Sequence, residues 1–173
     1  MNFYAYTTAF TEIEVEPDGF EKTIELAKDV RSRTGRVFFI GNGGSAAIAS
    51  HMAIDWMNKA EIPAMAFNDS AALTCLSNDY GFESVFSRPM IMHDFGEDDL
   101  LFAISSSGKS RNILKAVERA DEATGKVITL TGFDPDNPLR KLGDVNFYVR
   151  SHSYGVVETV HLGILHTLLD ALC

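Results

Sequence analysis

The sequence predicts an α/β fold in which a five-stranded parallel sheet is the middle layer of a three-layer αβα sandwich. Stretches of strand length alternate along the chain with longer stretches of helical periodicity, as in parallel α/β proteins. The runs VFFI, LLFAI and VITL, which begin at residues 37, 100 and 127, are largely apolar and do not alternate with polar residues. Such runs are typical of strands that helices cover on both faces. A Gly-rich and a Ser-rich loop follow the first two runs, at strand-to-helix turns.

The first half of the chain begins with an aromatic lead-in, which we expect to be irregular and to pack on the domain or on a neighbouring subunit. After it, Phe20, Ile24 and Ala27 lie near one helical stripe that Gly35 ends, and Pro63 precedes a short strand. In order, we expect the lead-in, a helix, a strand, a helix and a strand over residues 1–17, 20–32, 36–40, 46–59 and 64–67.

Turn residues divide the second half of the chain. Asp69 is a candidate cap for a short helix, and Pro89 is expected to kink or interrupt a later one. In order, we expect a helix, a turn, a helix, a strand, a helix, two strands and a helix over residues 70–76, 77–81, 82–92, 99–104, 109–123, 127–130, 145–149 and 157–172. The sequence predicts one domain over residues 1–173.

Composition excludes several classes of function. The formal net charge of −9 leaves no broad basic surface for nucleic acid, so local groups must hold any anionic ligand. Cys75 and Cys173 form no C-x-x-C pattern, which argues against a disulfide framework and a thiolate metal site. No basic residue precedes Lys22, which argues against a signal peptide, and no run approaches the roughly 18 apolar residues of a membrane span. We therefore expect a cytoplasmic protein that binds neither nucleic acid nor membrane.

The Gly-rich loop at residues 41–45 (GNGGS) suits an anion, because backbone N–H groups and the helix dipole converge at such a turn. It begins like a dinucleotide-binding fingerprint, with Asp69 near the end of the next strand. Ala46 stands where that fingerprint has its third glycine, which disfavours the dinucleotide interpretation.

The Ser-rich loop at residues 105–110 (SSSGKS), preceded by Ala103, resembles a P-loop. A P-loop has glycine in place of that alanine and a nearby strand that ends in an aspartate for magnesium, and this chain has neither. The serine hydroxyls can instead donate to several oxygens of a phosphomonoester. The plainer alternative is a Ser-rich turn that caps a helix. Together the two loops predict a crevice for a phosphorylated ligand.

Histidines and carboxylates on two predicted helices are candidates for metal binding or acid–base chemistry. His51 and Asp55 are four residues apart and share one helix face. Glu158 and His166 are eight residues apart, about 12 Å along a helix, so either Glu158 lies at or before the helix start or the two serve different copies of a site. Two histidines and two carboxylates suit zinc or a similar divalent ion. The alternatives are a surface histidine at His51 and a histidine packed in the core or an interface at His161.

The segments GNGGSAAIASHMAIDW, SNDYGFESVFSR, ISSSGKSRNILKAVERA and KVITLTG, in that order, resemble the sugar isomerase (SIS) domain family. Within it they look like the bacterial phosphoheptose isomerase subfamily, and the resemblance covers about residues 20–172. It implies a flavodoxin-like fold and the interconversion of sedoheptulose 7-phosphate and D-glycero-D-manno-heptose 7-phosphate. It also implies a homotetramer with active sites at subunit interfaces.

The resemblance assigns roles to the matching residues. At the substrate it places Asn42, Gly43, Gly44 and Ser45 in the site wall, Asn78 and Asp79 at the sugar, and Ser105, Ser106, Ser107 and Ser110 at the phosphate. As zinc ligands it implies His51, Asp55, Glu158 and His166, of which Asp55 and Glu158 also meet the substrate. Asp55 and His166 stand at the catalytic positions and are the expected acid–base pair.

Two positions depart from the family pattern. Asp55 replaces a glutamate, which sets the proton-transferring group back by roughly 1.5 Å. Glu158 replaces a glutamine, and its charge strengthens a cation site but repels an anionic enediolate. The alternative functions are a non-enzymatic SIS-domain binding protein, of the kind that associates with a replication initiator, and a sugar-phosphate sensor. Because Asp55 and His166 can both transfer protons, the enzyme is the favoured hypothesis.

Overall fold

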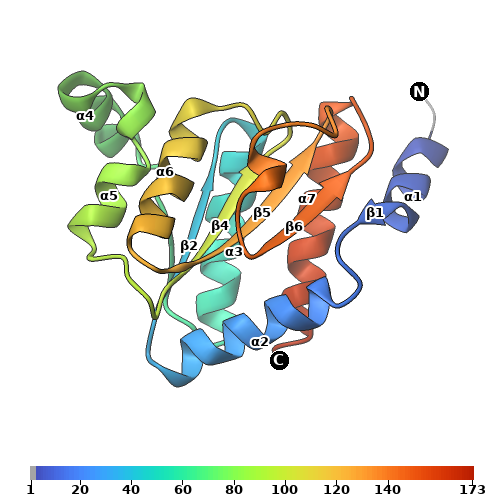
Figure 1. Cartoon of the computed structure of the whole chain (residues 1–173), viewed down its shortest axis with the longest axis horizontal. Coiled ribbons are helices and arrows are strands. Elements are labelled where there is room, and N and C mark those ends of the chain that lie inside the picture. The colour runs from blue at the N-terminus through green and yellow to red at the C-terminus, as the bar shows by residue number, and fades with distance from the viewer. Residues whose placement is uncertain (1–2) are drawn as a thin grey trace.

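A six-stranded sheet forms the middle of the structure, in the order β1-β6-β5-β4-β2-β3 (Figure 1). The structure is a computed structural model and describes residues 3–173. The strands are β1 (Ile13–Glu14), β2 (Val37–Gly41), β3 (Ala64–Ala66), β4 (Leu100–Ser105), β5 (Lys126–Gly132) and β6 (Val145–Val149). Strands β2 to β6 are parallel, which confirms the predicted parallel sheet. The predicted count of five is wrong, because β1 adds an antiparallel edge strand beside β6.

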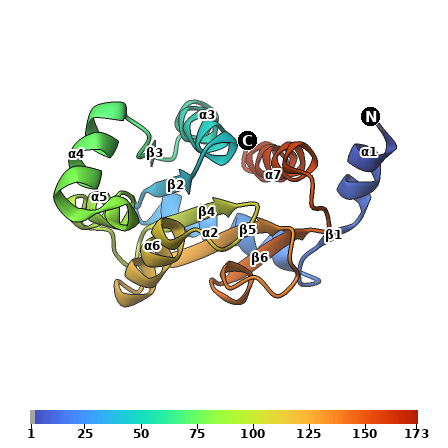
Figure 2. The ribbon, with the colours of Figure 1, turned by 90° about the horizontal axis from the view of Figure 1, so that it is seen from above.

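Helices cover both faces of the sheet, as the sequence predicts. They are α1 (Tyr4–Thr11), α2 (Gly19–Ser32), α3 (Gly44–Lys59), α4 (Ser70–Tyr80), α5 (Ser87–Met92), α6 (Arg111–Glu122) and α7 (Tyr154–Asp170), with 3-10 turns at Phe82–Ser84 and Leu139–Lys141. Figure 2 shows α3 and α7 side by side on one face and α6 on the other. One apolar core lies under α2, α3 and α7, and a second lies under α4, α5 and α6.

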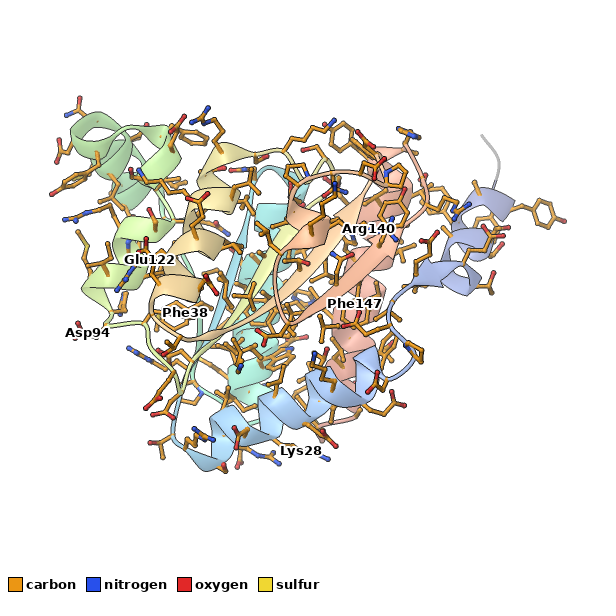
Figure 3. The ribbon with its side chains drawn as sticks, in the orientation of Figure 1. Lys28, Phe38, Asp94, Glu122, Arg140 and Phe147 are labelled. Atoms are coloured by element: carbon orange, nitrogen blue, oxygen red, sulfur yellow. The ribbon has the colours of Figure 1, made fainter. Side chains whose placement is uncertain are left out.

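Aromatic packing holds α3 against the centre of the sheet. Phe39 of β2 and Phe102 of β4 stack with ring centroids 4.9 Å apart. Trp56 of α3 meets both rings edge-on, at 5.5 and 5.2 Å. Side chains fill the space on either face of the sheet, with Phe38 and Phe147 inside and Lys28 on the outer side of α2 (Figure 3). Because Trp56 is fully buried, α3 is fixed in place, and with it the polar residues on its exposed side.

The lead-in is structured, so the prediction of an irregular segment is wrong. Helix α1 packs on α7, where Phe10 lies against Gly163 and the Tyr6 hydroxyl lies near Gly155. Packing on the domain, one of the two expected destinations, is confirmed. Strand β1 is fastened by Glu14, whose carboxylate pairs with Arg140 and Arg150 at 2.7 and 2.5 Å. Two-residue strands and a helix shorter than three turns leave too little periodicity to detect in a sequence.

Several other boundaries also differ from the prediction. The expected turn at 77–81 is the last part of α4, which Gly81 ends with a φ of +79°. The interruption between 82 and 92 comes before Pro89, which occupies the first turn of α5, where a missing N–H costs no hydrogen bond. Helix α7 begins at Tyr154, three residues before the expected start.

Candidate active site

The two predicted loops meet because their strands are neighbours. Gly41, the last residue of β2, pairs with Ile104 near the end of β4. A cavity of about 310 Å³ opens at these strand ends, where ligands bind in open parallel sheets. It is lined by Asn42, Gly43, Gly44, Ser45, Ile104, Ser105, Ser106, Ser107, Ser110, Tyr154 and Glu158. Nine of these residues belong to the two loops or to the strand before the second.

Glycines at the start of α3 allow the first loop to approach the rest of the site. Gly43 has a φ of +57°, in the left-handed region that glycine tolerates. A Cβ at Gly44 would lie 2.3 Å from Oε2 of Glu158, so only glycine leaves room for that carboxylate. The carboxylate therefore lies against the N-terminal end of α3, where the helix dipole favours negative charge.

The second loop directs a free hydroxyl group into the cavity wall. Ser105 Oγ accepts the Gly108 N–H at 3.2 Å, and Ser107 Oγ accepts the Lys109 N–H at 3.3 Å. Ser106 is 4% exposed, and its Oγ has no hydrogen-bond partner in the structure of residues 3–173. Ser110 precedes α6 and makes no side-chain cap hydrogen bond. A buried hydroxyl without a partner is uncommon in folded proteins, and this one belongs to a residue of the cavity lining.

Among residues 3–173, no lysine or arginine lines this cavity. The two basic residues nearest in sequence are engaged elsewhere, since Lys109 pairs with Asp134 at 2.9 Å and Arg111 pairs with Glu83 at 2.8 Å. An anion in the cavity must therefore be held by hydroxyl groups, backbone N–H groups and the first turns of α3 and α6. This agrees with the expectation that local groups, not bulk charge, bind the ligand.

Asn112 supports the first loop, and the sequence reasoning missed it. It is 2% exposed on α6, and its side-chain amide exchanges two hydrogen bonds with that of Asn42, at 2.9 and 3.0 Å. A buried amide pair of this kind fixes the direction of both side chains. The signal that could have found it is an asparagine on the apolar stripe of an otherwise amphipathic helix.

A second cluster joins α3 to α7. One ligand atom from each of His51, Asp55 and His166 lies within 4.8 Å of the others, a group that could hold a metal ion. His51 Nε2 lies 3.6 Å from Asp55 Oδ2, and the two imidazole centroids are 5.3 Å apart. Two imidazoles and one carboxylate form the donor set of a zinc site with an open fourth position.

The structure separates Glu158 from that cluster. Glu158 is the fifth residue of α7, so it lies neither at nor before the helix start. Its eight-residue separation from His166 corresponds to about 12 Å of helix. Asp55 is eleven residues beyond Gly44 on α3, about 16 Å away along the axis. Within one chain the loop cavity and the metal cluster are therefore distinct places.

Three further residues have clear positions. Asn78 and Asp79 are exposed on α4 and hydrogen-bond each other at 2.8 Å, and neither lines the cavity of the same chain. His161 is fully buried, with Nε2 3.0 Å from the Thr131 carbonyl oxygen, which confirms the expected core histidine. Burial lowers the pKa of His161 to about 4, so the ring is neutral at physiological pH.

Comparison with known proteins identifies the family. The SIS domain model matches residues 3–132. A phosphoheptose isomerase of Yersinia pestis is 35% identical over 181 residues, covering 99% of this chain and 92% of its own length. The chain belongs to the SIS domain family. Two solved structures, of the phosphoheptose isomerases of Neisseria gonorrhoeae and Francisella tularensis, superpose on this chain with TM-scores of 0.87 and 0.86.

Those two structures place the chain among the phosphoheptose isomerases of the SIS family. They are 32% and 31% identical to it, and the match covers 98% of this chain and 92% and 90% of theirs. The α/β fold that the sequence motifs imply is therefore confirmed over nearly the whole chain. In the described part of this SIS chain, no helix has both the length and the apolar character to cross a bilayer.

Proposed function

We propose that this chain is a phosphoheptose isomerase that interconverts sedoheptulose 7-phosphate and D-glycero-D-manno-heptose 7-phosphate. The observation that carries the proposal is the cavity at the ends of β2 and β4, with the unpartnered buried hydroxyl of Ser106 in its wall. A site of hydroxyl and N–H donors without a fixed cation suits a phosphate group. The near-full-length likeness to phosphoheptose isomerases favours a sugar phosphate over other phosphorylated ligands.

Phosphate binding positions the reacting carbons. The phosphate is held by three residues of the serine loop, the last of which precedes α6: Ser106, Ser107 and Ser110. The binding energy gained at this remote group orients the other end of the sugar. Asn42, kept in place by Asn112, meets the sugar from the opposite loop.

Asp55 and His166 carry the proton transfers. One of them removes the proton from C1 of the ketose, next to the carbonyl, which leaves an enediolate. The proton is returned to C2, while the second group moves a proton between the two oxygens, and the aldose results. Asp55 has two carboxylate oxygens, so one can serve as a ligand while the other faces the substrate.

His51, Asp55 and His166 fit zinc, because their donor atoms converge and their chemistry matches its preferred ligands. When bound, zinc supplies Lewis-acid polarisation of the sugar carbonyl. Glu158 stays with the phosphate cavity of the same chain, so its role in metal binding belongs to a site shared between chains.

We assign the complete active site to two subunits of a homo-oligomer, in a tetramer as the family resemblance implies. Within one chain, the acid–base pair and the phosphate cavity lie at different places along α3 and α7. Ile54 and Met57 flank Asp55 on α3 and are 59% and 42% exposed. Apolar side chains beside a catalytic carboxylate suit a face that a second copy covers.

The test is an isomerase assay of the purified protein on five- to seven-carbon sugar phosphates, with elemental analysis of the same sample. We expect bound zinc and turnover of sedoheptulose 7-phosphate, and loss of turnover in Asp55→Asn and His166→Ala. Asp94→Asn, which alters an exposed carboxylate at the margin of the molecule, is the matched control (Figure 3). Full activity in Asp55→Asn would refute the acid–base assignment. No metal and no turnover would instead favour a non-enzymatic binding protein.

Subunit sharing has its own test. Alone, the Asp55→Asn chain should be inactive and the Ser106→Ala chain weakly active. Activity should rise when the two chains are co-expressed, because some mixed interfaces then combine an intact cavity with an intact acid–base pair. No gain in the mixed oligomers would place both parts of the site in one chain.

A further inference from the structure

Phe133 has a strained backbone beside the cavity. It directly follows β5 and has a φ of +58°, in the left-handed region that bulky side chains avoid. Residues remain in such conformations only where the surrounding structure holds them, and they gather at functional sites. The contacts around Phe133 therefore indicate what the strain achieves.

Two hydrogen bonds hold the Phe133 backbone in this conformation. Its N–H donates to the Ser151 carbonyl oxygen at 3.0 Å, and its own carbonyl oxygen accepts the Tyr148 hydroxyl at 2.9 Å. The Arg140 guanidinium lies 3.9 Å from the Tyr148 ring centroid and fixes that ring in turn. Burial raises the pKa of Tyr148, so its hydroxyl keeps the proton that it donates.

The strained backbone directs the Phe133 ring between two aromatic neighbours. The ring stacks on His152 with centroids 5.9 Å apart and meets Tyr154 edge-on at 4.7 Å. Edge-to-face pairs at this distance are favourable beyond the area that they bury. Tyr154 is the first residue of α7, where a side chain has few neighbours from its own helix. Phe133 is therefore a main support of the Tyr154 ring.

Tyr154 lines the cavity although it is 62% exposed. It lies four residues before Glu158, on the same face of α7, and the serine loop is part of the same lining. Apart from Tyr154 and Ile104, the lining consists of glycine, serine, asparagine and glutamate. The hydroxyl and N–H donors of the two loops are therefore available for an anion without Tyr154. An aromatic ring at such a place offers an apolar surface to carbon-bound hydrogens and a hydroxyl to a polar group.

We propose that Tyr154 contacts the carbon chain of the bound sugar phosphate, and that Phe133 is the positioning residue that holds the Tyr154 ring over the cavity. The inference rests on the proposed function and adds a contact to its substrate site. It assigns Tyr154 to the sugar and leaves the phosphate to the serine loop. The contributions of the carbon chain and of the phosphate to the binding affinity can therefore be measured separately.

The test compares Tyr154→Ala, Tyr154→Phe and Phe133→Gly with the unaltered protein. Glycine at 133 keeps the left-handed backbone without strain and removes only the ring. Each variant is measured for KM and kcat with sedoheptulose 7-phosphate, for calorimetric affinity for that sugar phosphate, and for inhibition by inorganic phosphate. Tyr4→Ala, at an exposed tyrosine of α1 outside the cavity, is the matched control.

We expect Tyr154→Ala to raise KM and the sugar-phosphate Kd roughly tenfold. Inhibition by inorganic phosphate should stay within about twofold, since that probe has no carbon chain. Phe133→Gly should shift the same constants in the same direction by a smaller factor. Tyr154→Phe should restore most of the affinity that Tyr154→Ala loses, because the ring remains, and Tyr4→Ala should leave the constants unchanged.

Unchanged sugar-phosphate affinity in Tyr154→Ala would overturn the inference. An equal loss of affinity for inorganic phosphate and for the sugar phosphate would also overturn it, because the residue would then act through the phosphate loop. Absence of turnover in the unaltered protein would refute the proposed function alone, since calorimetry still measures the contact between Tyr154 and the sugar.

Discussion

Replacing Ser106 with alanine should weaken ligand binding and, at the same time, stabilise the empty protein. These effects have opposite signs because the Ser106 hydroxyl is buried without a partner in the described structure. In the empty protein, no group among the described residues hydrogen-bonds to this hydroxyl. In the complex, it donates to a phosphate oxygen.

The expected magnitudes follow from the cost of an unsatisfied group and the strength of a charge-assisted hydrogen bond. Leaving a buried polar group without a partner costs about 1–3 kcal/mol, so removing the hydroxyl should raise the free energy of unfolding by up to that amount. A hydrogen bond to a charged group contributes about 1.5–3 kcal/mol, so the Kd for phosphate should rise roughly ten- to hundredfold.

The assay combines denaturant unfolding with calorimetric titration of inorganic phosphate and of the sugar phosphate. Ser87→Ala is the matched control, because Ser87 is also 4% exposed but donates to the Ser84 carbonyl oxygen at 3.5 Å, away from the cavity. That variant should lose a little stability and keep its phosphate affinity. If Ser106→Ala bound phosphate as tightly as the unaltered protein, the loop would not be the phosphate site.

Three further predictions concern Asn112, His161 and Asp55. Asn112→Ala should leave the Asn42 amide without its partner, lower the stability by about 1–3 kcal/mol and raise KM more than it lowers kcat, which denaturant unfolding and steady-state kinetics would measure. Folding lowers the pKa of His161 from 6.5 to about 4, so between these pH values the unfolded chain binds one more proton than the folded protein. The contribution to stability should be complete above pH 6.5, and the free energy of unfolding should fall by about 3 kcal/mol as the pH drops to 4. Unfolding measured as a function of pH should lose this dependence in His161→Leu. Asp55→Glu should move the carboxylate forward by roughly 1.5 Å and raise kcat without altering inhibition by phosphate, whereas an unchanged kcat would mean that the shorter side chain is already correctly placed.

The parts of the fold that could be predicted are those with strong local signals. Largely apolar runs identified β2, β4 and β5 because helices bury both faces of them, and glycines marked where helices end. Strand β1 and helix α1 could not be found in this way. Ile13 pairs with Val149 across more than a hundred residues, and α1 is fixed by contact with α7, so both depend on long-range neighbours.

In the functional site too, the residues with strong local signals could be predicted and the others could not. The two loops could be predicted because each needs small residues at a strand-to-helix turn, and adjacent strands then bring them together. Tyr154 was missed because it falls in a stretch that was expected to precede the last helix. Glu158 is close in sequence to His166, but eight residues of the same helix separate the two, so Glu158 lies with the cavity and not with the His51 cluster.

The central claim is that this chain isomerises a seven-carbon sugar phosphate by proton transfer through Asp55. The most direct measurement follows sedoheptulose 7-phosphate by nuclear magnetic resonance after addition of the purified protein. The account predicts that signals of D-glycero-D-manno-heptose 7-phosphate appear and grow to equilibrium, and that Asp55→Asn leaves the ketose unchanged over the same time. An unchanged ketose spectrum with the unaltered, folded protein loaded with zinc would contradict it.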